Sequence, residues 1–181
     1  MMNHVREVSW TRPGLVGKVP LGLDVARLRE ETASLLERHP MIFENTQQLA
    51  LQIRPGTEDP WYESCYQEKD IAPEDAYDTL NPELRGTYFE TVLDAFPFQV
   101  RRARLMALSG RTCYSVHRDE TARYHVAIDT TEHALFIFVD KNEVVRIPPD
   151  GDGYLVDTRE VHTAMNGARN RRLHLVVAAA E

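Results

Sequence analysis

Short apolar runs separated by turn-forming residues fill the second half of the chain. Ser109-Gly110 and the run Asp150-Gly151-Asp152-Gly153 are the clearest turns. Apolar runs of this length between turns are typical of β-strands. We therefore expect strands over residues 99–108, 112–117, 123–129, 134–139, 143–147, 153–156, 162–165 and 172–178.

The first half of the chain mixes helical and extended patterns. Asp24 can cap a helix in which Leu28 and Leu35 lie on one apolar face, because positions i and i+7 fall on the same side of a helix. A second helix is expected over residues 82–95. Residues 47–53 alternate loosely enough to predict a strand.

Residues 57–79 show no period and are rich in acidic residues, proline and tyrosine, which favours a long ordered loop or lid over a core element. Trp61, Tyr62 and Tyr66 lie within this loop. Two interpretations of these rings stay open. They fasten the loop to the body of the protein, or Trp61 and Tyr62 contact the substrate.

This order of elements predicts a mainly β fold with flanking helices. Many short strands in succession favour two antiparallel sheets arranged as a double-stranded β-helix, the cupin-like jelly roll, with the helices packed outside one sheet. A chain of 181 residues has the size of one compact domain. We expect a single domain over residues 1–181, in which 1–97 form a support and lid and 98–181 form the jelly-roll core.

Charge and composition argue against several classes of partner. The chain has 21 basic and 28 acidic residues, and its formal net charge of −7 would repel a nucleic-acid backbone. We find no run of the roughly 20 apolar residues that a membrane span needs, and residues 1–8 lack the apolar run of a secretory signal. Two cysteines cannot form a disulfide framework. We expect a cytoplasmic protein that binds neither nucleic acid nor membrane.

His117 and Asp119 stand two positions apart at the end of an expected strand, so their side chains point to the same face. His162 opens a later strand, where a jelly roll would bring a third ligand back to the same place. Two histidines and one carboxylate leave three coordination positions of an octahedron open, the arrangement of non-haem Fe(II) oxygenases. A His-x-Asp pair alone is weak evidence in a chain with 7 histidines, so an ordinary structural role stays open.

Arg172 opens the last expected strand and shares a face with His174. An arginine on the interior face of a β-sandwich is costly without an anionic partner. Its planar guanidinium suits the distal carboxylate of 2-oxoglutarate, to which it can donate two parallel hydrogen bonds. Arg123 and His125 project together from a neighbouring strand and are candidates for a carboxylate of co-substrate or substrate. An ion pair with an acidic residue is the alternative for Arg123, and Arg104 is a weaker candidate for contact with the substrate.

The segments that carry these candidates resemble, in their order and spacing, the aspartyl/asparaginyl β-hydroxylase family, and within it small bacterial enzymes similar to L-proline cis-hydroxylases. They are Arg104-Leu105, His117-Arg118-Asp119, Arg123-Tyr124-His125, Val156-Asp157, His162 and Arg172-Leu173-His174-Leu175-Val176-Val177. The resemblance implies a double-stranded β-helix, Fe(II) at His117, Asp119 and His162, and 2-oxoglutarate held by Arg172 with help from Arg123 or His125. The β-hydroxylases proper lack the metal-binding acid, so Asp119 favours the proline-hydroxylase-like branch.

These features predict an Fe(II)- and 2-oxoglutarate-dependent dioxygenase that uses dioxygen to hydroxylate an aliphatic carbon of an amino acid or amino-acid-like substrate, either a small molecule or a peptide. Two alternatives stay open. A cupin-type metalloenzyme would use the same metal without the keto acid, and 2-oxoglutarate would not stimulate it. A non-catalytic β-sandwich binding module would hold His117 and His162 as ordinary polar residues, and its melting temperature would not respond to metal.

Overall fold

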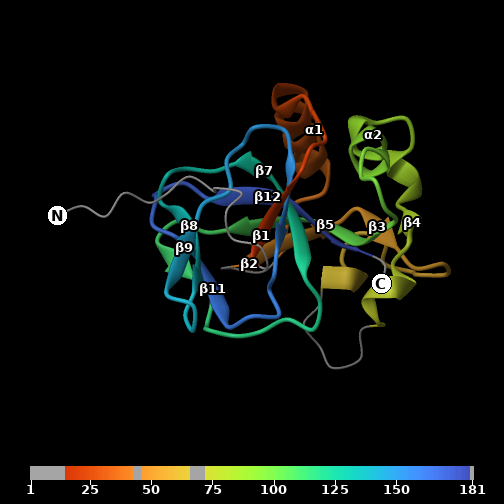
Figure 1. Cartoon of the computed structure of the whole chain (residues 1–181). Helices are drawn as coiled ribbons and strands as arrows, with labels where there is room; N and C mark the ends of the chain where they lie inside the picture. The colour runs from red at the N-terminus through yellow and green to blue at the C-terminus, as the bar shows by residue number, and fades with distance from the viewer. Residues whose placement is uncertain (1–14, 43–45, 66–71, 180–181) are drawn as a thin grey trace.

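Two antiparallel sheets form the body of the protein in the computed structural model, which describes residues 15–42, 46–65 and 72–179 (Figure 1). The large sheet has the strand order β1 (Val16–Val19), β10 (Gly153–Val156), β7 (Arg123–Asp129), β12 (Arg172–Ala179), β5 (Val100–Leu108) and β2 (Thr46–Ala50). The small sheet has the order β6 (Thr112–Cys113), β11 (His162–Asn166), β8 (Ala134–Phe138) and β9 (Glu143–Val145). This arrangement confirms the predicted double-stranded β-helix.

The helices cover the outer face of the large sheet. In Figure 1, α1 (Val25–Arg38) and α2 (Tyr88–Asp94) stand beside each other at the top, and β8, β9 and β11 lie together at the left. As predicted, Asp24 caps α1, since its carboxylate accepts a hydrogen bond from the Arg27 N–H. Neither helix of the described ranges has the length and apolarity needed to cross a membrane.

Strand β12 is buried on both faces and separates two environments. Leu173, Leu175 and Val177 belong to the apolar cluster that also contains the buried apolar side chains of α1 and α2. The alternate residues Arg172 and His174 point toward the small sheet and are only 3% and 1% exposed. Apolar side chains therefore stabilise the outer layer, while the space between the sheets contains buried polar groups.

Several predicted elements differ in extent from those observed. The expected helix over 82–95 is two pieces, a 3-10 turn (Pro82–Leu84) and α2, because Gly86 has a positive φ of 75° that breaks the helix. The expected strand over 47–53 divides into β2 and β3 (Gln52–Ile53), and β3 pairs with β4 (Thr79–Leu80) in a separate two-stranded sheet.

Strand β1 was not expected from the sequence, and it forms one edge of the large sheet by pairing with β10. Since β2 forms the other edge, both edges of that sheet come from the first half of the chain. The expected strand over 112–117 ends after β6, and the expected strand over 143–147 ends at Val145. Tyr66 and residues 1–8, on which the sequence also raised expectations, lie outside the described residues.

Candidate metal centre

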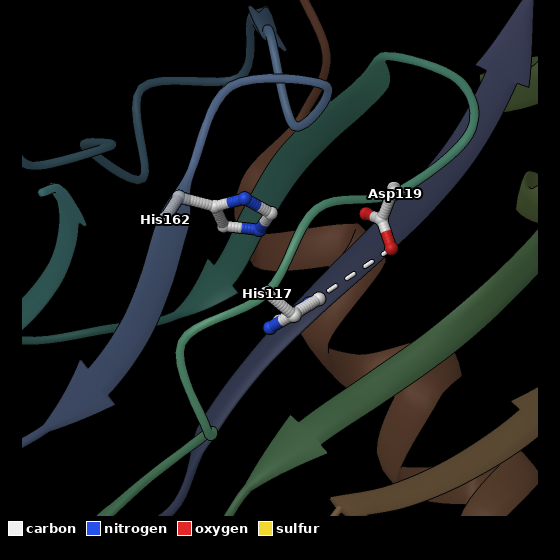
Figure 2. Close-up of side chains that lie close together, drawn as sticks. All are labelled: His117, Asp119 and His162. Carbon is white, nitrogen blue, oxygen red and sulfur yellow. Dashed lines mark ion pairs between the residues drawn. The ribbon is translucent and has the colours of Figure 1, made fainter. Parts of the chain in front are cut away.

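Three side chains gather where the small sheet meets the loop that follows β6. The ligand atoms of His117, Asp119 and His162 all lie within 4.8 Å of one another. Figure 2 shows His162 on β11 and the other two on the loop, with the three side chains around a common space. The dashed line joins Nε2 of His117 to Oδ1 of Asp119, which are 3.9 Å apart. A small inward movement would place all three side chains on one divalent ion.

Backbone hydrogen bonds fix the positions of these residues. The backbones of His117 and His162 form a reciprocal pair of hydrogen bonds, each with a donor–acceptor distance of 3.0 Å. The backbone N–H of Asp119 donates to the carbonyl of Thr158 at 2.9 Å. These bonds attach the loop to β11 and to the segment before β11. They bring His117 and Asp119 next to His162 although no continuous strand spans residues 112–117.

Each imidazole is oriented for metal binding by a hydrogen bond to the backbone carbonyl two residues before it. Nδ1 of His117 lies 2.7 Å from the carbonyl oxygen of Ser115, and Nδ1 of His162 lies 2.9 Å from that of Glu160. A carbonyl only accepts, so Nδ1 carries the proton and Nε2 presents its lone pair to the shared space. Burial lowers the pKa of His162, which favours the neutral form that binds a metal.

A cavity of about 580 Å³ opens beside these ligands, between the two sheets. A cavity of this size accommodates a small co-substrate and part of a substrate. Its walls include the three ligand candidates and four arginines. The arginines are Arg102, Arg104, Arg123 and Arg172.

One part of this cavity contains polar atoms that are buried and have no hydrogen-bond partner within the described ranges. They include Nε and Nη1 of Arg172, Nε2 of His125 and the hydroxyl of Tyr114. The guanidinium of Arg172 also lies over the ring of Phe136, 5.2 Å from its centroid. Buried donors without partners are rare in proteins, so this group fits an anionic ligand that supplies acceptors.

His125 lies against His174 of the neighbouring strand, with their Nδ1 atoms 3.4 Å apart. Burial, with a further contribution from the charge of Arg172, holds the pKa of both well below the ordinary value. Both rings are therefore neutral near pH 7. Arg172 remains the cation of this part of the cavity, and His125 contributes a neutral polar atom.

Arg123 has a partner of its own. Its guanidinium binds both carboxylate oxygens of Glu74, at 2.6 and 2.8 Å, and also contacts the hydroxyl of Thr121. The same carboxylate accepts from Arg102 at 3.0 Å. This is the ion pair that the sequence left open as the alternative for Arg123. Arg123 also lies 3.9 Å from Asp119, so it stands between the ligand loop and Glu74.

Arg104 is 6% exposed, and within the described residues its charge has no carboxylate partner. Nη1 donates to Oε1 of Gln48 at 2.8 Å, while Nε is buried and unpaired. Burial, and after it the positive charge of Arg102, lower its pKa to about 9. The group still carries a positive charge at neutral pH.

Trp61 and Tyr62 do not line the cavity in the described part of the chain. The Trp61 ring stacks on His39, with centroids 3.9 Å apart, and belongs to the apolar cluster under the helices. The Tyr62 hydroxyl donates to the carbonyl oxygen of Pro40 at 2.9 Å. Both rings fasten the loop to the end of α1, the first of the two interpretations that their sequence positions allowed.

Three residues of this region were not identified from the sequence. Gln48, Glu74 and Tyr114 reach the cavity or its arginines from three separate segments, β2, the loop before β4 and the loop after β6. Of the three, only Gln48 could have been suspected from the sequence, because it is an amide side chain within an expected strand. Gln48 is buried, and a buried glutamine needs a polar partner. Their roles depend on strand register, which one sequence does not reveal.

No family model matches the chain, and no curated protein matches it. Solved structures do match. A 2OG-Fe(II) oxygenase-family oxidoreductase from Burkholderia pseudomallei has 14% sequence identity and a TM-score of 0.56, over 93% of this chain and 85% of the other. A Pseudomonas putida prolyl-4-hydroxylase has 13% identity and a TM-score of 0.53, over 92% of each chain.

A further match is a prolyl hydroxylase in complex with a hypoxia inducible factor oxygen degradation domain peptide fragment, from Trichoplax adhaerens. It has 11% identity and a TM-score of 0.57, over 94% of this chain and 85% of the other. At such identities the likeness shows the fold. The chain therefore has the double-stranded β-helix found in 2OG-Fe(II) oxygenases, and what it does has to be argued from its own residues.

Proposed function

We propose that this protein is an Fe(II)- and 2-oxoglutarate-dependent dioxygenase that hydroxylates an aliphatic carbon of an amino acid or amino-acid-like substrate. One observation carries the proposal. A group of two histidines and one carboxylate, with ligand atoms within 4.8 Å, borders the same cavity as a buried arginine that has no anionic partner among the described residues. The first feature suits Fe(II), and the second suits a dicarboxylate.

The residues present fit these two groups. The Nε2 atoms of His117 and His162 and an oxygen of Asp119 are the donors that Fe(II) accepts in non-haem oxygenases, and three ligands leave positions for other molecules. Arg172 would bind the distal carboxylate of 2-oxoglutarate, with the Tyr114 hydroxyl and His125 Nε2 as additional partners. Each of these atoms is buried and unpaired, so binding would remove a desolvation cost.

In the reaction, 2-oxoglutarate, dioxygen and a C–H group become succinate, carbon dioxide and an alcohol. Fe(II) with its keto acid supplies the oxygen-activating chemistry when bound. The chain supplies position and charge. Arg172 would orient the keto acid through its far end, Asp119 and the two imidazoles would hold the metal, and the surrounding apolar strands would limit access of water.

Several finer features belong to the same proposal. We assign the chain to the proline-hydroxylase-like branch of the aspartyl/asparaginyl β-hydroxylase family, because Asp119 supplies the acid in the ligand set. Its partner would be a small-molecule or peptide substrate rather than nucleic acid. A cytoplasmic location agrees with Cys65 and Cys113, which form no disulfide.

A thermal-shift experiment separates this function from its two rivals. For the proposed enzyme, Mn(II) raises the melting temperature, 2-oxoglutarate raises it further only when metal is present, and a chelator reverses both effects. A protein that responds to metal and ignores 2-oxoglutarate would be a cupin-type metalloenzyme. A melting temperature indifferent to Fe(II), Mn(II) and chelator would favour the non-catalytic module and contradict the proposal.

A further inference from the structure

Three arginines lie near the Glu74 side of the cavity, and two of them share one carboxylate. Glu74 binds Arg102 at 3.0 Å and Arg123 at 2.6 Å. The third, Arg104, has only the neutral amide of Gln48 as a partner, at 2.8 Å. Since the other two arginines have an acid, the lack of one among the described residues distinguishes Arg104 from both of them.

Leaving Arg104 unpaired is costly. A buried cation without a counter-ion destabilises a fold, and the nearby charges of Arg102 and Arg123 add repulsion. A structural role would be served as well by an apolar side chain of similar length. An expensive, unsatisfied charge on a cavity wall is typical of a binding residue whose partner is the ligand.

The cavity also keeps excess positive charge after the proposed cofactors bind. A divalent metal and Arg172 carry three positive charges, which Asp119 and the dianion of 2-oxoglutarate balance. On the other side, among the residues that the structure describes, Arg102, Arg104 and Arg123 face one carboxylate, that of Glu74. Two positive charges therefore remain near Arg104, so the second ligand of this cavity should be an anion.

Arg104 and Arg172 are separate anchoring points. On neighbouring strands, Arg104 pairs in register with Val176, while Arg172 pairs with Leu108, four residues further along β5. At about 3.4 Å per strand residue, their Cα atoms lie roughly 14 Å apart along the strand direction. One small dicarboxylate held at the metal and at Arg172 therefore leaves Arg104 to a different molecule.

We propose that Arg104 and Gln48 bind a free carboxylate of the substrate, so that the substrate class is carboxylic acids rather than carrier-bound acyl groups or neutral molecules. This inference rests on the proposed function and narrows it. Arg104 Nε would donate to the carboxylate, while Gln48, whose Oε1 already accepts from Nη1, has its amide N–H groups left to donate. A planar carboxylate accepts from two such donors side by side.

The test is a thermal-shift and calorimetric titration of the Mn(II)-loaded protein saturated with 2-oxoglutarate. The probes are L-amino acids and N-acetyl-L-amino acids, each paired with its primary amide, which removes the charge and keeps the shape. We expect acids of the panel to raise the melting temperature above the 2-oxoglutarate baseline and their amides to have no effect. R104M should weaken binding of the acids about 30-fold or more, and leave the affinity for 2-oxoglutarate unchanged.

Two variants add readouts that need no substrate. R104M should raise the melting temperature of the unliganded protein, because it removes an uncompensated buried charge. Q48E should raise it too and abolish binding of the acids, because a carboxylate at position 48 would pair with Arg104 internally. R85Q, at an exposed arginine, removes one charge elsewhere and should change neither property.

The inference would be overturned by acids and amides that stabilise the protein equally, by an R104M variant that keeps acid binding, or by a panel in which no acid adds to the baseline. If 2-oxoglutarate itself failed to stabilise the metal-loaded protein, the proposed function would fail instead. The two failures are therefore distinguishable.

Discussion

Arg172 and the three ligand candidates have different expected roles, so single substitutions should separate co-substrate binding from metal binding. In R172M the ligand atoms of His117, Asp119 and His162 are untouched, and Mn(II) should still bind. The affinity for 2-oxoglutarate should fall about 30-fold or more, because a buried carboxylate would lose its charged partner. Calorimetric titration measures both affinities. R171Q, at the exposed neighbour, is the matched control, and full 2-oxoglutarate affinity in R172M would show that Arg172 is not the anchor.

His162 tests the metal itself. H162A should abolish binding of Mn(II) or Fe(II) in equilibrium dialysis, because the two remaining ligands, both of them partly exposed side chains, hold a divalent ion poorly. H133A removes an exposed histidine from the turn before β8 and should bind metal normally. Equal metal content in both variants would contradict the ligand assignment.

The sequence predicted the roles of some residues of the site but not of others. His117, Asp119 and His162 were recognisable from residue type and spacing, and the fold brings them together. The residues that surround Arg123 and Arg104 could not be predicted in this way. Whether an arginine pairs with Glu74 or only with Gln48 depends on which loop packs over which strand. This packing is a property of the tertiary structure and leaves no local pattern in the sequence.

At the scale of elements, Glu74 fastens a short 3-10 turn (Glu74–Ala76) to β5 and β7. Burial alone would raise the pKa of Glu74, but the charges of Arg123 and Arg102 and the bond from Thr121 outweigh it and lower the pKa. We expect E74Q to lower the free energy of unfolding by about 2 kcal/mol near neutral pH, since two arginines then lose their shared acid. Denaturant titration measures the loss, and E83Q, at a largely exposed acid, is the control.

The pH dependence of this loss follows from the direction of the pKa shift. A carboxylate whose pKa is depressed in the folded protein stabilises it above the unfolded pKa of about 4.3, and this contribution disappears as the pH falls through the folded value. The difference between wild type and E74Q should therefore be full above about pH 5 and shrink below about 4.3. A difference that stayed constant to low pH would mean that the Glu74 charge does not contribute.

Elements with strong local patterns were predicted well. The helix after Asp24 and strands β5, β7, β8, β10, β11 and β12 lie close to their expected ranges, because alternation and turn residues are local signals. The break at Gly86 and the early end of β6 were not predicted. A glycine can continue or end a helix, and a strand ends where its partner ends, so both depend on packing.

Across the whole molecule, charge is distributed unevenly. The formal net charge is −7, yet the described residues along the cavity walls include four arginines and one aspartate. The sequence predicted the negative net charge and the fold class. The cluster of arginines in the cavity depends on how the two sheets pack together, so it could not be predicted. An acidic surface disfavours polyanions and a basic interior favours small anions, which agrees with the small acidic co-substrate that we propose.

The most direct test of the central claim is the visible spectrum of the purified protein with Fe(II) and 2-oxoglutarate in the absence of oxygen. A keto acid that chelates Fe(II) through two of the open positions gives a metal-to-ligand charge-transfer band. We predict this band in the wild type, its loss in H162A, and its appearance in R172M only at much higher 2-oxoglutarate concentration. A folded, iron-loaded wild type without the band at saturating 2-oxoglutarate would contradict the assignment of His117, Asp119, His162 and Arg172 to one oxygenase site.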